Sequence, residues 1–191
     1  MEILGRLFGS EAKVKIIRLF LFNPETVFES KDISSRVKES SIKIRSELSN
    51  LERIEFIKRK TKTKSKKGFI LNKNFSYLNP LQNLLINSKP LQPKEIIRKV
   101  SSLGNVKLII VAGVFIQDPD SRVDILIAGD SIKVGPVEKM MKKLESEIGK
   151  ELKYSYFSTQ EFNYRLNMYD KLIRDVLDYP HIILVNKLAT L

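Results

Sequence analysis

Cysteine and tryptophan are both missing from the 191-residue chain, and histidine occurs once, at His181. Without cysteine, neither a disulfide framework nor a thiolate metal site can form, and a lone histidine does not supply a zinc site. We therefore expect an intracellular, cytoplasmic protein that uses no metal or other cofactor.

Long apolar runs are missing as well. Uncharged stretches such as Leu108–Gln117 stop well short of the ~20 residues that a helix needs to span a bilayer. The first residues lack the basic region and apolar core of a signal peptide, and no glycine-rich phosphate loop of the Walker or dinucleotide type occurs. We expect a soluble protein with no membrane partner.

Positive charge is abundant and unevenly placed. Of the formal net charge of +12, residues 1–78 carry a net +9, from 18 Lys and Arg against 9 Asp and Glu. Residues 79–191 carry only +3, from 16 against 13. This asymmetry favours a polyanion such as nucleic acid as the partner of the N-terminal part, and anionic lipid is the other partner that the charge allows.

The stretch Ser40–Asn72 predicts a helix with one apolar face. Ile44, Leu48 and Leu51 recur at helical spacing, so these three side chains should be core. The remaining sides carry small, polar or basic residues: Ser41, Lys43, Arg45 and Ser46. Such a helix is suited to lie on a polar surface, and an α-helix fits the major groove of B-DNA.

A basic hairpin follows directly. FIKRKTKTK alternates, a turn falls at Ser65–Gly68, and FILN resumes an extended pattern. Lysine or arginine occupies positions 58, 59, 60, 62, 64, 66 and 67. A lysine run in isolation more often marks a solvated or blunted edge strand, so the succession of helix and hairpin is what favours nucleic acid.

The residues before this stretch predict two further helices with a short extended segment between them. Ser10 should cap a helix that ends at Asn23-Pro24, Thr26–Phe28 should be briefly extended, and Ser30 should cap a short helix. The run KDISSRVKESSIKIRSELSNLERIEFIKRK followed by KKGFILN resembles the winged helix-turn-helix domains of ArsR-type and MarR-type regulators, over roughly a third of the chain. One departure is Glu55, where such domains often have glycine, and it predicts that the helix runs slightly further.

The resemblance implies roles for two sets of residues. The longer helix would present its N-terminal half to base edges through Ser41, Ile42, Lys43, Arg45 and Ser46. The hairpin would be the wing, and its phosphate contacts would come from Lys60, Lys62, Lys64, Lys66 and Lys67. Exposed helix residues without function are the plain alternative for the first set.

The rest of the chain predicts an α+β protein of two domains. Residues 1–78 would be the winged domain, residues 79–104 a helical linker with a helix opened by Pro93 and stopped by Gly104, and residues 105–191 a mixed α/β domain. The expected elements of that domain are strands 106–111, 123–128, 152–157 and 181–185 and helices 136–148, 159–167 and 169–177. Asp130 is expected in a turn after the second strand.

The run LIIVAGVFIQDPDSRVDILIAGD resembles the core of the nucleotidyltransferase superfamily, over residues 105–187. Active members place Gly-Ser after the first strand and two Asp, one residue apart, on the second, where they share Mg²⁺. Gly113 keeps the glycine position and Asp124 the second acid, but Arg122 stands at the first acid and Val114 replaces the serine. The resemblance therefore implies an inactive site with Asp124 in local hydrogen bonds, unless Asp118 or Asp120 moves in.

The leading expectation is a regulator that binds double-stranded DNA as a homodimer. Its C-terminal domain would serve dimerisation or the sensing of a small-molecule or nucleotide effector. The alternative is an active nucleotidyltransferase that the winged domain delivers to its substrate. A winged helix that binds RNA or protein is a third reading, because fold does not fix function.

Overall fold

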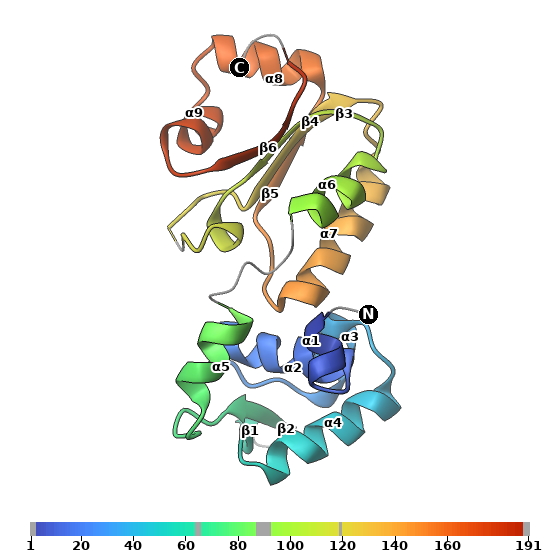
Figure 1. Ribbon diagram of the computed structural model, residues 1–191, viewed down its shortest axis with the longest axis vertical. Coiled ribbons are helices and arrows are strands. Elements are labelled where there is room, and N and C mark those ends of the chain that lie inside the picture. Colours follow the sequence, from blue (N-terminus) through green and yellow to red (C-terminus); the bar gives the residue numbers. More distant parts are fainter. Residues whose placement is uncertain (1–2, 64–65, 87–92, 119, 189–191) are drawn as a thin grey trace. The chain divides into compact units, whose positions relative to one another are not determined.

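The computed structural model describes residues 3–63, 66–86, 93–118 and 120–188, and within this range the side chains of residues 62, 63 and 66 lie outside the description. Helices and two separate β-sheets make a mixed α/β chain (Figure 1). The chain divides into two compact units. Unit 1 comprises Met1–Ser88 together with Lys142–Lys150, and unit 2 comprises Lys89–Met141 together with Glu151–Leu191.

Unit 1 is built from helices followed by a β-hairpin and a last helix. The elements in chain order are α1 (Ile3–Leu7), α2 (Glu11–Phe22), α3 (Ser30–Val37), α4 (Ser41–Arg53), β1 (Ile57–Thr63), β2 (Lys66–Leu71) and α5 (Leu78–Leu85).

Two helix starts test the predicted capping residues. Ser10 is the N-cap of α2, and its hydroxyl accepts a hydrogen bond from the Lys13 backbone N–H at 3.2 Å, as predicted. The predicted cap at Ser30 is wrong by one residue. Glu29 is the N-cap of α3, and it forms a reciprocal capping box with Asp32, so Ser30 becomes the first helical residue.

The end of α4 differs from its prediction. The helix does not run further; it stops at Arg53, and Glu55 adopts the left-handed conformation with φ 61°. The Glu55 N–H donates to the Glu52 carbonyl at 2.9 Å, and the Phe56 N–H donates to the Leu51 carbonyl at 3.0 Å. These two bonds form a Schellman motif, so Glu55 occupies the position that glycine usually takes.

The hairpin is anchored on the short extended segment that precedes α3. Strands β1 and β2 are antiparallel, with Ile57 opposite Leu71 and Lys60 opposite Gly68. Phe28 and Phe69 exchange two backbone hydrogen bonds, of 2.9 and 2.8 Å, which confirms an extended segment at Phe28. A Cβ on Gly68 would lie 2.7 Å from the Phe28 carbonyl oxygen, so this close approach requires glycine.

One apolar core holds unit 1 together. It combines the inner faces of α2, α3 and α4 with the start of β1 and the end of β2. Ile44, Leu48 and Leu51 are all buried in it, which confirms the predicted apolar face of α4. Phe20 and Phe28 meet edge to face with ring centres 5.6 Å apart.

The last residues of α7 (Val134–Ile148) also belong to unit 1. Arg18 of α2 is only 1% exposed, and its guanidinium donates to the carbonyl oxygens of Leu85 at 3.3 Å and Glu147 at 3.0 Å. Gly149 follows the last residue of α7 with φ 89°, and a Cβ there would lie 2.6 Å from the Leu19 nitrogen. The buried arginine thus satisfies carbonyls at two helix ends.

Unit 2 is a four-stranded sheet covered by helices. Its elements are α6 (Pro93–Ser101), β3 (Asn105–Val111), the 3₁₀ turn η1 (Gly113–Phe115), β4 (Ile125–Asp130), most of α7, β5 (Tyr154–Phe157), α8 (Thr159–Asn167), α9 (Lys171–Asp178) and β6 (Ile182–Asn186). The strand order is β5-β4-β3-β6, in which only the β4–β5 pair is parallel.

Most predicted elements of unit 2 are confirmed to within two residues, and α8 matches at both ends. One residue was placed wrongly. Asp130 is the last residue of β4 rather than part of a turn, because it pairs with Asn105 and its carboxylate lies 2.9 Å from the Lys107 ammonium. That lysine lowers the Asp130 pKa below its ordinary value.

The sheet of unit 2 lies between two helical layers. Leu108 and Ile110 of β3 pack with Phe162 of α8 and with Ile173 and Val176 of α9. Helix α6 and the N-terminal part of α7 lie on the other side (Figure 1). The continuous apolar runs of β3 and β4 fit this position, because strands covered on both faces carry apolar residues throughout. None of the described helices combines the length and apolar character that a membrane span requires.

Candidate nucleic-acid interface

The outward side of α4 carries the five residues proposed to meet base edges. Each of them is exposed: Ser41, Ile42, Lys43, Arg45 and Ser46. Ile42 is 83% exposed, so its apolar side chain is available for contact with another molecule. Because Ile44 and Leu48 anchor the opposite side in the core, the helix holds this outer face in a fixed orientation.

The N-terminus of α4 keeps its partial positive charge. The Ser40 N-cap side chain accepts no hydrogen bond from the first turn, and that turn contains no acidic residue. The first backbone N–H groups of a helix have no partner within the helix, and the helix dipole makes this end attractive to anions. The start of α4 is therefore suited to approach a phosphate.

Three residues connect α3 to α4 in a tight turn. Lys38 takes the left-handed conformation with φ 54°, and the Ser34 hydroxyl donates to the Glu39 carbonyl oxygen at 2.7 Å. A short turn of this kind between two helices is typical of a helix-turn-helix unit. It fixes where α4 starts relative to α3.

Glu39 organises the cations beside the turn. Its carboxylate lies 2.9 Å from the Lys15 ammonium and 3.5 Å from the Lys43 ammonium. Burial alone would raise the Glu39 pKa, but Lys15 and then Lys43 outweigh it, so the pKa lies below its ordinary value. Lys15 is the closer partner, which leaves Lys43 loosely held and 67% exposed.

Arg45 has no ion pair or side-chain hydrogen bond with any residue that the structure describes. Its guanidinium carries up to five donors in a planar arrangement that matches guanine O6 and N7 or two phosphate oxygens. Of the five outward residues of α4, Arg45 is therefore the one best prepared to bind a new partner.

The hairpin presents further cations next to α4. Lys58 and Lys60 of β1 and Lys67 of β2 are exposed. Lys62 and Lys66 lie on the two strands, but their side chains fall outside the description, and Lys64 lies outside the described residues altogether. Two of the five proposed phosphate contacts, Lys60 and Lys67, are thus placed on the surface of the hairpin.

An ion pair joins the hairpin to α4. The Arg59 guanidinium donates to both carboxylate oxygens of Glu52, at 2.7 and 3.1 Å. Arg59 lowers the Glu52 pKa and Glu52 raises the Arg59 pKa. Arg59 also lies over the Phe69 ring at 5.7 Å. Arg59 thus has an internal role, unlike the neighbouring lysines, and sequence periodicity carries no signal for this pair because it crosses from helix to strand.

The residues of unit 2 that the sequence resemblance to nucleotidyltransferases singled out have a different environment. Asp124 is 4% exposed, and its two carboxylate oxygens accept hydrogen bonds from the backbone N–H groups of Val114 and Lys153, both at 2.8 Å. Gly113 has φ 52°, and a Cβ there would lie 2.1 Å from Asp124 Oδ1. The structure thus brings Gly113 and Asp124 into contact and uses the carboxylate to hold two loops.

Arg122 does not join Asp124. Its Nη1 atom lies 2.9 Å from Asp175 Oδ2 of α9, as an ion pair without hydrogen-bond alignment. Asp118, Asp120 and Asp175 line a shallow cavity of about 260 Å³ together with Arg122. The described residues contain no cluster of three or more His, Asp or Glu arranged to hold a metal ion.

No family model, curated protein or solved structure matches the chain.

Proposed function

We propose that the protein is a DNA-binding transcriptional regulator of the winged helix-turn-helix type. Helix α4 would enter the major groove, and the β1–β2 hairpin would lie along the neighbouring phosphates. The observation that carries the proposal is the five-residue outer face of α4 beside the exposed lysines of a hairpin that Glu52 and Arg59 tie to the same helix.

The chemistry of the α4 face suits base edges. Lys43 and Arg45 would donate to guanine O6 and N7, and Ile42 would contact a thymine methyl group. Ser41 and Ser46 would bond to bases or phosphates. Lys60 and Lys67 would neutralise phosphates irrespective of sequence, which makes the affinity depend on salt.

Unit 2 would hold two copies together, so that two α4 helices read a symmetric site about one helical turn of DNA apart. The support is strand β6, which lies at the edge of the sheet and exposes Ile182 by 42% and Ile183 by 41%. Sedimentation of the wild type should give a dimer, and Ile183→Lys should shift it to a monomer. A monomeric wild type, free and on DNA, would contradict this part.

The enzyme alternative has less support. Both oxygens of Asp124 already accept backbone hydrogen bonds, and Arg122 occupies the position of the other acid. A carboxylate that shares a divalent ion must offer oxygen lone pairs toward it. Asp124→Asn should therefore leave DNA binding unchanged, whereas a transferase would lose nucleotide transfer.

The deciding experiment selects bound duplexes from a random pool in the presence of excess competitor RNA. We expect enrichment of a short sequence with twofold symmetry. Fluorescence anisotropy on the enriched duplex should then show an affinity that falls steeply with salt. A pool without enrichment would reject the proposal in favour of RNA or protein binding. So would DNA binding that the excess RNA competitor abolishes completely.

A further inference from the structure

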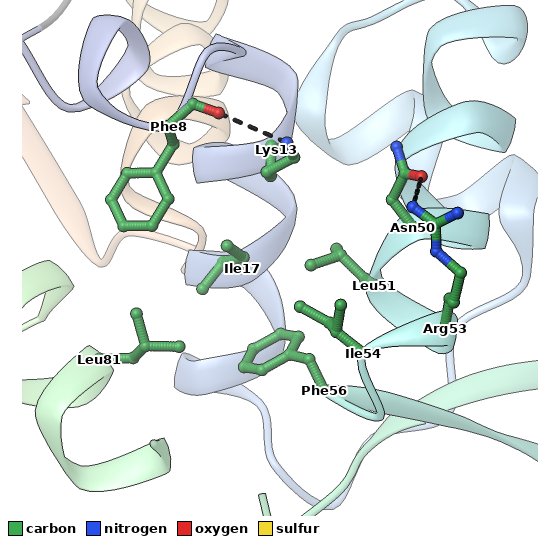
Figure 2. Close-up of a pocket in the computed structure, with 9 residues that line it drawn as sticks. All are labelled: Phe8, Lys13, Ile17, Asn50, Leu51, Arg53, Ile54, Phe56 and Leu81. Atoms are coloured by element: carbon green, nitrogen blue, oxygen red, sulfur yellow. Dashed lines mark hydrogen bonds between the residues drawn. The ribbon is translucent and has the colours of Figure 1, made fainter. Parts of the chain in front are cut away.

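A groove opens in unit 1 beside the end of α4. It has a volume of about 330 Å³, and its walls come from α2, α5, the end of α4 and the residues just outside α1 and β1. Figure 2 shows the side chains arranged around a common space, with Phe8, Ile17 and Leu81 facing Leu51, Ile54 and Phe56.

The body of the groove is apolar. Ile17, Leu51 and Phe56 form its buried floor, whereas Ile54 at the rim is 54% exposed. Apolar surface that stays in contact with water favours an apolar occupant, by about 25 cal/mol for each Å² covered. The volume is about twice the ~150 Å³ of a cavity that takes up benzene. The groove therefore fits a body of one or two rings, or a chain of similar size.

The charged side chains of the groove are all positive. Among the described residues, Lys13, Arg53 and the neutral Asn50 are the polar ones that line it, and no acidic side chain does. Their existing contacts are long: Lys13 Nζ lies 3.4 Å from the Phe8 carbonyl oxygen and 3.6 Å from Glu47, and Arg53 Nη2 lies 3.4 Å from Asn50 Oδ1. A compact anion could bind both cations without breaking a short ion pair.

We propose that this groove binds a small amphipathic monoanion, that is, an apolar body of one or two rings or a short chain that bears one carboxylate or sulfonate group. The apolar body would lie on Ile17, Leu51 and Phe56, and the anionic group would bind Arg53 and Lys13. Charge complementarity and volume select this class over a neutral hydrocarbon and over a polyanion.

The place of the groove gives binding a consequence for α4. Asn50, Leu51 and Arg53 belong to the last turn of α4, and Phe56 directly precedes β1. A bound anion would contact the helix and the base of the hairpin together. If the proposed function holds, the bound ligand changes the affinity of the protein for DNA. The factor equals the ratio of the ligand's affinities for the free and the DNA-bound protein. The binding site itself does not depend on the proposed function.

Two fluorescent probes test the site without DNA. Anilinonaphthalenesulfonate carries an apolar body and one negative charge, and phenylnaphthylamine has the same rings without the sulfonate. We expect the wild-type protein to bind one molecule of anilinonaphthalenesulfonate per chain in a saturable way. Its affinity for the neutral phenylnaphthylamine should be at least fivefold lower. The double variant Lys13→Gln/Arg53→Gln should weaken the sulfonate probe about fivefold, because two partly exposed contacts of roughly 0.5 kcal/mol each are lost.

Matched controls separate the groove from general charge effects. Lys139→Gln removes an exposed cation of α7 outside the groove and should leave both probes unchanged. Leu81→Glu and Leu81→Gln have nearly the same shape and differ in charge, so only the first should repel the sulfonate probe strongly. Circular dichroism melts confirm that each variant is folded before the affinities are compared.

Three outcomes would overturn the proposal. The first is equal affinity for the charged and neutral probes, and the second is an equal loss with Lys139→Gln. The third is a combination of two results: probe binding weakens as the protein concentration rises, and sedimentation shows a dimer that Leu81→Gln abolishes. These results would mean that a second copy of the chain covers the groove. Failure of DNA binding leaves this test unaffected, so the two proposals fail separately.

Discussion

Charged side chains are held differently on α4 and around Asp124. On α4, Arg45 has no partner among the described residues, and Lys43 shares Glu39 with a closer lysine. In unit 2, both oxygens of Asp124 are occupied by backbone N–H groups at 2.8 Å. Groups that bind another molecule must be exchangeable at low cost, whereas groups that hold a fold must not be.

The difference bears on how each resemblance is interpreted. The winged-helix pattern has its proposed binding residues on an outer surface, where their charges are available. The residues that resemble the nucleotidyltransferase pattern have their one acid, Asp124, inside, where it joins the loop after β3 to the residue before β5. In this position the carboxylate stabilises the fold through backbone hydrogen bonds.

The largest expected effect is on Asp124. Asp124→Ala leaves the buried N–H of Val114 and the partly buried N–H of Lys153 without acceptors, so we expect unit 2 to lose about 3 kcal/mol of stability. Urea unfolding followed by tyrosine fluorescence measures this, because five of the six tyrosines lie in unit 2. Asp120→Ala, which removes an exposed carboxylate from the same loop region, is the matched control and should change little. A neutral or stabilising Asp124→Ala would indicate a functional acid instead.

The second effect separates the α4 face from the hairpin. Lys43→Ala and Arg45→Ala should each weaken the selected duplex by about 1–3 kcal/mol and relax its sequence preference. Lys60→Ala and Lys67→Ala should weaken all duplexes alike, each reducing the salt slope by about 1. Anisotropy on the selected and a scrambled duplex at several salt concentrations measures both.

Lys139→Ala removes a cation far along the sequence from both sets and should leave the affinity of either duplex unchanged. If the α4 and hairpin variants lose the same fraction of affinity on every sequence, α4 does not read bases. The proposed division of roles, in which α4 contacts bases and the hairpin contacts phosphates, would then be wrong.

Local patterns predicted much of the fold. Apolar spacing identified the buried side of α4, Ser10 placed the start of α2, and Pro93 placed the start of α6. Such signals work because helix periodicity and caps depend on neighbours a few residues apart. The outer face of α4 could be proposed for the same reason, since whatever does not face the core faces outward.

Nonlocal arrangements could not be predicted. The Glu52–Arg59 pair, the insertion of Arg18 between two helix ends, and the groove at Phe56 each depend on segments that meet only in the folded chain. Asp130 was misplaced because its register with Asn105, and not its local composition, keeps it in β4. No single-sequence pattern encodes these contacts.

A smaller effect is expected at Glu55, where the glycine of related patterns is missing. Its φ of 61° is unfavourable for a side chain with a Cβ, so Glu55→Gly should stabilise the end of α4 by about 0.5–1 kcal/mol. Glu55→Ala removes the carboxylate but keeps the Cβ, and it should give no such gain. Amide hydrogen exchange of α4 measures the difference locally, and equal protection in both variants would show that φ is not the cause.

The smallest effect concerns the pH dependence of the link between α4 and the hairpin. Arg59 holds the Glu52 pKa below its ordinary value of 4.5, so the pair contributes stability that is fully present above pH 4.5 and is lost as the pH falls through the lowered pKa. Because both groups are exposed, the contribution is small. A double-mutant cycle with Glu52→Gln and Arg59→Gln, followed by unfolding at pH 7 and at several lower pH values, should show a coupling that is largest at pH 7 and decreases as the carboxylate is protonated. A coupling that does not change with pH would mean that Arg59 is held by Phe69 and not by the carboxylate, and the hairpin would then be positioned independently of α4.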